Sequence, residues 1–161
     1  MRYAKIRKMD ITNGPGIGVS IFFQGCRFHC QGCFNKETWD FSGGSLLTAD
    51  IINSFISIAN NEHIKRISIL GGEPLAQPCD EFLDFIKRLK RETNKPIYLW
   101  TGYEFNEIPE QYRKILYYID FIITGRFIEE LKDYNPMYGS SNQKIIDVKH
   151  TLENRKIVLA E

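Results

Sequence analysis

Three of the four cysteines in this chain lie within eight positions, in the segment GCRFHCQGCFN at residues 25–35. Three residues separate Cys26 from Cys30, and two separate Cys30 from Cys33. In a reducing compartment, clustered cysteines indicate a metal centre or catalysis before they indicate disulfides. We therefore expect these three thiols to act together as soft ligands supplied by one short loop.

The count of three favours an iron–sulfur cluster over zinc. A structural zinc site closes its shell with four ligands, commonly two pairs. Here Cys79 lies 46 residues beyond Cys33 with no cysteine beside it, and His29 is poorly placed to share an ion with Cys30. A cubane [4Fe–4S] cluster normally takes four thiolates, so three would leave one iron open to a ligand from outside the protein. A disulfide would leave one thiol over.

The elements that must position this loop are short apolar runs alternating with amphipathic stretches. That order implies a mainly parallel α/β sheet with helices packed outside. Because a full eight-unit barrel takes about 250 residues, we expect one domain over residues 1–161, an incomplete and open βα barrel. The expected strands are 19–26, 64–74, 95–103 and 120–127, with short ones in 143–148 and 155–160, and the expected helices are 47–62, 78–92 and 106–119.

Distinctive residues recur where these apolar strands stop. They are Cys26, the Gly71–Gly72–Glu73 stretch, Thr101–Gly102 and Thr124–Gly125. Ligands of parallel α/β proteins bind at the carboxyl ends of the strands. The four patches are therefore predicted to meet at one rim.

Bulk properties exclude some classes of function. The 21 basic and 20 acidic residues give a formal net charge of +1, which indicates neither a nucleic-acid nor a membrane partner. The first residues alternate charged and apolar types and lack the apolar segment of a signal peptide. No stretch approaches the roughly 20 apolar residues of a membrane span. We expect a cytoplasmic protein.

Motifs beyond the cysteines add a family resemblance. The segments NGPG, GCRFHCQGCFNKETWDFSGG, GGEPL, LWTGY and GSSNQ occur in this order, at 13–16, 25–44, 71–75, 99–103 and 139–143. Together they resemble the activating proteins of anaerobic (class III) ribonucleoside-triphosphate reductases, in the radical S-adenosylmethionine (AdoMet) superfamily. TWDF and GSSNQ discriminate best, since GGEP alone fits many radical AdoMet enzymes.

The resemblance implies a fold, a cofactor set and partners. It implies a radical-AdoMet barrel in which Cys26, Cys30 and Cys33 ligate a [4Fe–4S] cluster whose open iron binds AdoMet. An electron from a donor such as flavodoxin would cleave AdoMet to methionine and a 5′-deoxyadenosyl radical. That radical would take hydrogen from a glycine near the C-terminus of the large catalytic subunit of the reductase, and leave a glycyl radical there.

The resemblance also assigns AdoMet contacts. Carbonyl groups of Gly71, Gly72 and Glu73 would accept hydrogen bonds from the AdoMet ammonium, with Glu73 adding negative charge; the plain alternative is a strand-ending turn. Thr101 and Thr124 could contact the ribose or carboxylate, although Thr is also an ordinary strand residue. The family usually has an acidic residue at the position of Thr124.

Two aromatic residues are candidates for the adenine. Many radical AdoMet loops carry an aromatic residue before the third cysteine, where this chain has Gly32. Phe28 or Phe34 could pack on the adenine instead, or could belong to the core. Relatives often carry Arg where this chain has Tyr138, so we expect a charged contact to the partner to be missing here.

Two alternatives stay open from the sequence. The chain could activate another glycyl-radical enzyme of the pyruvate formate-lyase type, although those activases are typically longer. It could also be a metal-binding or electron-transfer module without AdoMet chemistry. Production of 5′-deoxyadenosine separates the second alternative from the activases.

Overall fold

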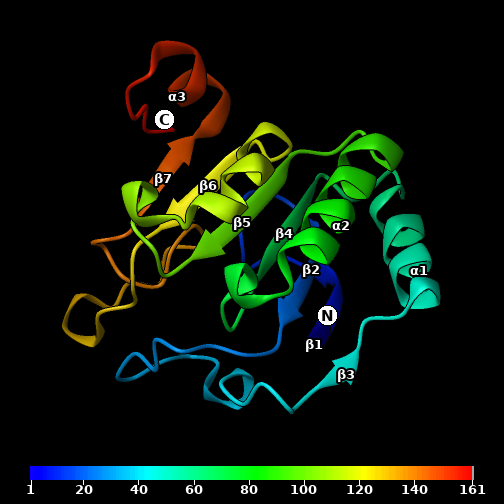
Figure 1. The fold of residues 1–161 in the computed structure, drawn as a ribbon, viewed down its shortest axis with the longest axis horizontal. Coiled ribbons are helices and arrows are strands. Elements are labelled where there is room, and N and C mark those ends of the chain that lie inside the picture. Colours follow the sequence, from blue (N-terminus) through cyan, green and yellow to red (C-terminus); the bar gives the residue numbers. More distant parts are fainter. Residues whose placement is uncertain (161) are drawn as a thin grey trace.

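The computed structural model describes residues 1–160, which form a mixed α/β fold around one seven-stranded sheet (Figure 1). The strand order is β3-β1-β2-β4-β5-β6-β7. The strands are β1 Arg2–Asp10, β2 Gly18–Phe23, β3 Ser45–Leu46, β4 Arg66–Gly71, β5 Ile97–Thr101, β6 Phe121–Thr124 and β7 Lys144–Asp147. The α-helices are α1 Ala49–Ala59, α2 Cys79–Glu92 and α3 Val148–Asn154. The 3₁₀ helices are η1 Lys36–Thr38, η2 Pro74–Ala76, η3 Phe105–Glu107, η4 Glu110–Tyr117 and η5 Glu129–Leu131.

The centre of the sheet is parallel, as the strand–helix order predicts. Strands β2, β4, β5 and β6 pair in parallel, whereas β1, β3 and β7 add antiparallel strands at the two sides. The sheet is not closed, because β3 and β7 are its two edges. The pairing thus establishes an open sheet, and the more specific description as a partial barrel stays a prediction.

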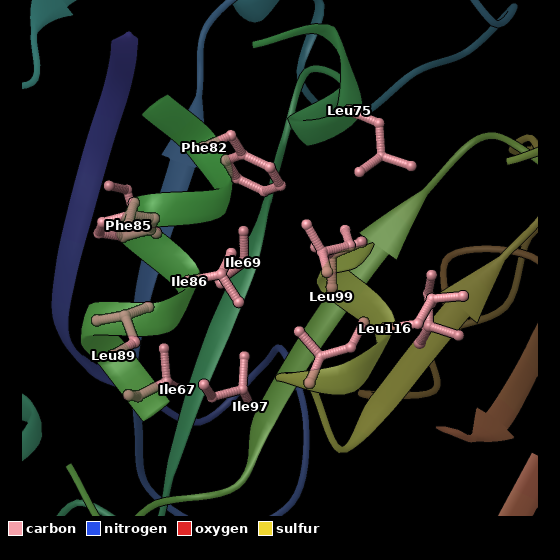
Figure 2. Packing of buried hydrophobic residues seen from close by; sticks show 14 of the residues in the cluster. Ile67, Ile69, Leu75, Phe82, Phe85, Ile86, Leu89, Ile97, Leu99 and Leu116 are labelled. Carbon is pink, nitrogen blue, oxygen red and sulfur yellow. The ribbon is translucent and has the colours of Figure 1, made fainter. Parts of the chain in front are cut away.

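Helices cover one face of the sheet and bury its core (Figure 1). Figure 2 shows the apolar side chains of α2 beside Ile67 and Ile69 of β4, while Ile97 and Leu99 of β5 lie between these residues and Leu116 of η4. These strand residues alternate along their strands, so all of them point to the same face. Burial of each such side chain contributes about 1.5–3 kcal/mol relative to exposure. The helix residues of this contact are Phe82, Phe85, Ile86 and Leu89.

Local signals explain where the helices begin and end. Thr48 caps α1, its Oγ1 accepting a 3.4 Å hydrogen bond from the amide of Ile51. Helix α2 has acidic residues in its first turn and basic residues in its last turn, which complement the helix dipole. At its end, Thr93 Oγ1 donates a 2.7 Å hydrogen bond to the carbonyl of Leu89.

Three details differ from the sequence prediction. The expected helix over 106–119 is wrong: this region forms η3 and η4, interrupted at Ile108 and Pro109, where proline has no N–H to donate to a continuous helix. The C-terminal segment 155–160 contributes one bridge, Ile146 to Leu159, instead of a strand. Strand β1 has no counterpart among the expected strands.

None of the helices within residues 1–160 is long and apolar enough to cross a bilayer.

Candidate functional site

One cavity of about 580 Å³ lies against the sheet face that the helices leave uncovered. Loops that follow β2, β4 and β5 contribute to its wall, as expected for the carboxyl ends of parallel strands. Nine of the ten predicted site residues line it: Cys26, Phe28, Cys30, Cys33, Phe34, Gly71, Gly72, Glu73 and Thr101. Thr124 is not among the lining residues.

The three clustered thiols are free and face the same cavity. Cys26 is buried, and Cys30 and Cys33 are partly exposed. Their loop is fixed to the segment after it, because the amide of Gly25 donates to Thr38 O (2.7 Å) and that of Cys26 to Trp39 O (3.2 Å). The loop geometry therefore does not depend on a ligand alone.

The thiols have the environment of sulfur ligands. The amide of Asn35 donates a 3.4 Å hydrogen bond to Cys33 Sγ. Burial raises the pKa of Cys26 and that of Cys30, while backbone N–H groups that hydrogen-bond to both sulfurs oppose this rise. Such donors favour the thiolate form, which is the form that binds metal.

The donor set is compatible with a cluster. Among residues 1–160, no three His, Cys, Asp or Glu side chains meet closely enough to hold one metal ion. A cubane cluster requires a different spacing of its ligands, because each thiolate binds a separate iron atom and the thiolate sulfur atoms lie further apart. Three free thiols with backbone donors, around one cavity, are compatible with a [4Fe–4S] group.

The Gly-Gly-Glu stretch is held against the cysteine loop by its backbone. The amide of Gly72 donates to Phe23 O (2.9 Å), and the amide of Glu73 donates to Gly25 O (2.8 Å). Glycine is required here, because a Cβ on Gly72 would lie 2.5 Å from Gly25 O. The end of β4 thus lies directly beside the start of the cysteine loop.

Glu73 is a buried carboxylate that joins two strand ends. Its Oε1 accepts hydrogen bonds from the amide of Leu75 (2.9 Å) and from Thr101 Oγ1 (2.9 Å), and its Oε2 accepts one from the amide of Gly102 (2.8 Å). Burial raises the pKa of Glu73 to about 7, against the lowering effect of these donors. The side chain therefore has a local structural role in addition to the predicted charge.

The two threonines at the strand ends differ in their surroundings. Thr101 contacts Glu73 and lines the cavity. Thr124, which pairs with Thr101 in the sheet, is fully buried, and its Oγ1 has no hydrogen-bond partner among residues 1–160. The structure thus places Thr124 beside Thr101 in the sheet but outside the cavity.

The two predicted adenine-contacting rings lie at different parts of the cavity. Phe28 packs edge-on against Tyr103, with ring centres 4.9 Å apart, and the Arg126 guanidinium lies 4.6 Å from its centre. Phe34 is half-exposed and lies 5.0 Å from Phe127. Both rings have aromatic neighbours already, and both line the cavity.

Comparison with known proteins agrees with this geometry. Residues 12–146 match the family described as "4Fe-4S single cluster domain". The chain is 37% identical over 150 residues to the anaerobic ribonucleoside-triphosphate reductase-activating protein of Haemophilus influenzae, covering 90% of this chain and 97% of that protein. The proteins of the same name from Escherichia coli K12 and phage T4 are each 35% identical, covering 90% of this chain and 97% and 93% of theirs.

The chain belongs to the anaerobic ribonucleoside-triphosphate reductase-activating protein family.

In this activating protein, several cavity residues had no predicted role. The segment 133–136 lines the cavity, and next to it the carbonyl of Met137 accepts a 3.0 Å hydrogen bond from Trp100 Nε1. On β1, Lys5 and Arg7 lie 4.6 and 5.1 Å from the ring centre of Phe22. Their alternation with apolar residues in the sequence was the available signal for a strand with one polar face.

The GSSNQ segment of the activating protein closes a turn at the cavity. Gln143 Oε1 accepts hydrogen bonds from the amides of Gly139 (2.8 Å) and Ser140 (3.2 Å), and its Nε2 donates to Gly125 O (2.8 Å). Gly139 and Gln143 line the cavity. The motif therefore fixes Gly125, directly after β6, to the turn at 139–140.

Proposed function

We propose that this chain activates anaerobic ribonucleoside-triphosphate reductase as a radical AdoMet enzyme. The observation that supports this proposal most directly is that Cys26, Cys30 and Cys33 line one cavity together with Gly71–Glu73. A [4Fe–4S] cluster bound there supplies the electron that breaks the C5′–S bond of AdoMet. The products are methionine and a deoxyadenosyl radical, which takes hydrogen from the α-carbon of a glycine near the reductase C-terminus. This transfer gives 5′-deoxyadenosine and a glycyl radical.

The chain contributes position and shielding. Cys26, Cys30 and Cys33 hold the cluster, and the backbone bonds from Gly25 and Cys26 to the segment 38–39 orient their loop. Trp39 lines the cavity and stacks on His29, with ring centres 4.4 Å apart. This aromatic pair would limit access of water to the cluster side of the cavity.

The AdoMet contacts follow from the strand ends. Carbonyl groups of the Gly71–Glu73 stretch accept from the AdoMet ammonium, and the absence of Cβ atoms at Gly71 and Gly72 lets this stretch pack against the backbone of Phe23 and Gly25. Thr101 lies near the ribose or carboxylate, and Phe28 or Phe34 packs on the adenine. We assign no ligand contact to Thr124, because its side chain does not line the cavity.

The partners complete the proposal. The large catalytic subunit of the reductase presents its glycine at the open mouth of the partial barrel, and an electron donor such as flavodoxin reduces the cluster. We propose that these steps take place in the cytoplasm. The curated relatives carry the reductase in their names, which supports this choice of partner over another glycyl-radical enzyme.

The test is anaerobic reconstitution with iron and sulfide, followed by reduction in the presence of AdoMet. The proposal expects 5′-deoxyadenosine, and it expects a glycyl radical signal by electron paramagnetic resonance after the reductase is added. A chain that carries a cluster but forms no 5′-deoxyadenosine would be an electron-transfer module. Radical formation on a pyruvate formate-lyase but not on the reductase would identify the other activase.

A further inference from the structure

A buried arginine lies outside the predicted site. Arg66 is the first residue of β4 and is 1% exposed. A buried guanidinium is costly unless its N–H groups find acceptors, and an apolar side chain of similar size often serves stability as well. An arginine at this position is therefore explained by the groups that its directional N–H donors hold in place.

The donors of Arg66 hold the loop 11–17. Its Nε donates to Pro15 O (3.0 Å), and its Nη2 donates to Asp10 O (2.8 Å) and Gly16 O (3.5 Å). Its Nη1 donates to Ser68 Oγ (2.6 Å), which in turn donates to Asn13 O (2.7 Å). One side chain thus binds two carbonyl groups of this loop directly, and a third through Ser68.

The loop is shaped to receive the guanidinium. A Cβ on Gly14 would lie 2.7 Å from Arg66 Nε, and a Cβ on Gly18 would overlap Nη1. Gly14 also has a φ of +115°, a conformation that residues with a side chain rarely adopt. The Gly-Pro-Gly sequence therefore fits the space around Arg66 as well as forming a turn.

A buried carboxylate completes the polar cluster. Asp10 is 2% exposed and accepts from the amide (2.8 Å) and hydroxyl (2.9 Å) of Thr12 and from Asn13 Nδ2 (2.7 Å). Ser20 Oγ also donates to it. Asp10 thus orients the side chains of Thr12 and Asn13, while Arg66 orients the loop backbone.

The loop so held is part of the cavity wall. Thr12 and Asn13 line the same cavity as the three cysteines. The amide of Gly14 donates a 2.8 Å hydrogen bond to Pro136 O, so the loop also contacts the segment 133–136 that lines the cavity. A shift of the loop would therefore move two parts of the wall.

We propose that Arg66 is a positioning residue for the reaction: its guanidinium fixes the loop 11–17, and through it the wall against which AdoMet and the reductase glycine segment are placed. This inference rests on the proposed function for the identity of the reactants. The position of the loop itself can be tested without activity.

The test compares Arg66→Lys with Arg88→Lys in the reconstituted holoprotein. Lysine keeps the charge of residue 66 but cannot reach several carbonyl groups at once. Arg88 makes the matched control, since its bonds go to Glu92 and Asn53 on the helix side of the sheet. Ser68→Ala, which removes the link to Asn13 and the acceptor of Arg66 Nη1 but keeps the other bonds of Arg66, is the milder variant if Arg66→Lys does not fold.

In Arg66→Lys we expect the backbone N–H groups within residues 12–16 to exchange hydrogen about tenfold faster than in the wild type. Loss of about 1.4 kcal/mol of hydrogen bonding would give this factor. Iron content should match the wild type. The half-saturating concentration of AdoMet or of reductase should rise severalfold while the maximal rate is kept within about twofold. Ser68→Ala should move the same readouts less, and Arg88→Lys should not move them.

Unchanged exchange at 12–16 would overturn the proposal, and so would faster exchange with unchanged half-saturation. Faster exchange throughout the sheet would also overturn it, because that result indicates a general structural role. If the wild type forms no 5′-deoxyadenosine, the proposed function fails, and the exchange result at 12–16 still shows whether Arg66 fixes the loop.

Discussion

Thr101 Oγ1 donates a 2.9 Å hydrogen bond to Oε1 of Glu73, and this contact joins the ends of β5 and β4 beside the cysteine loop. Oε2 of the same carboxylate accepts from the amide of Gly102, and Oε1 also accepts from that of Leu75. One buried side chain therefore sets the relative position of two strand ends. The loop 72–73 is in turn bonded to Phe23 and Gly25, so the cysteine loop is held by the same group of contacts.

Replacement of Thr101 by Val should destabilise the protein, whereas replacement of Thr124 by Val should not. The Thr101 variant removes one of the three donors to the buried Glu73 side chain, at a cost of about 1–3 kcal/mol. Thr124 Oγ1 has no partner among residues 1–160, so an apolar replacement removes an unsatisfied group. Urea unfolding of the two variants under oxygen-free conditions measures the difference. Equal costs would contradict the assigned contacts.

Glu73 should make stability depend on pH between about 4.5 and 7. Burial raises the pKa of Glu73 from 4.5 to about 7, so the folded state binds its proton more tightly than the unfolded state. The resulting contribution of Glu73 to the free energy of unfolding is fully present below pH 4.5 and is lost as the pH rises through 7. The free energy of unfolding of the wild type, relative to Glu73→Gln, should fall across this window and stay level above it.

The Glu73→Gln variant serves as the reference because it cannot titrate. Residue 73 of the variant contributes no pH dependence of its own, and its amide N–H₂ group cannot accept from Gly102 as a carboxylate does. A difference between the two proteins that does not change from pH 4.5 to 7 would show that Glu73 has an ordinary pKa.

Cys30→Ala should abolish activity, and Cys79→Ala should leave it intact. Cys30 lines the cavity with Cys26 and Cys33, and a cluster held by two thiolates would be lost or unstable. Cys79 is the first residue of α2, where its Sγ donates to Gln111 O at 3.0 Å, outside the cavity. Iron content and 5′-deoxyadenosine yield should both fall in the first variant alone. Loss of iron in both variants would assign Cys79 to the metal centre.

Most of the site could be predicted because its residues lie at strand ends. Parallel strands bring their carboxyl ends to one edge, so Cys26, Gly71–Glu73 and Thr101 meet although the sequence separates them widely. Thr124 follows the same rule by position in the chain. Successive side chains of β6, however, point to opposite faces of the sheet. Thr124 therefore points to the same face as Ile122, which belongs to the helix-covered core. Thr101 shares the parity of Leu99 in the same way, so period-two reasoning does not separate the two threonines.

The Arg66 cluster could not be derived from chain order alone. Ser20, Arg66 and Ser68 do show polar residues at alternate positions of two apolar strands, which is the signal for a polar side of the sheet. Their connection to the loop 11–17 depends on the antiparallel return of β1, which periodicity did not reveal. The 3₁₀ form of η4 likewise reflects packing and the position of Pro109, which helix-period reasoning does not resolve.

The most direct test of the account is chromatography of 5′-deoxyadenosine after the reduced, anaerobically reconstituted protein is mixed with AdoMet. The account predicts 5′-deoxyadenosine and methionine in equal amounts from the wild type and neither product from Cys30→Ala. A wild-type protein that holds a single zinc ion, or that carries a reduced cluster and leaves AdoMet intact, would contradict it.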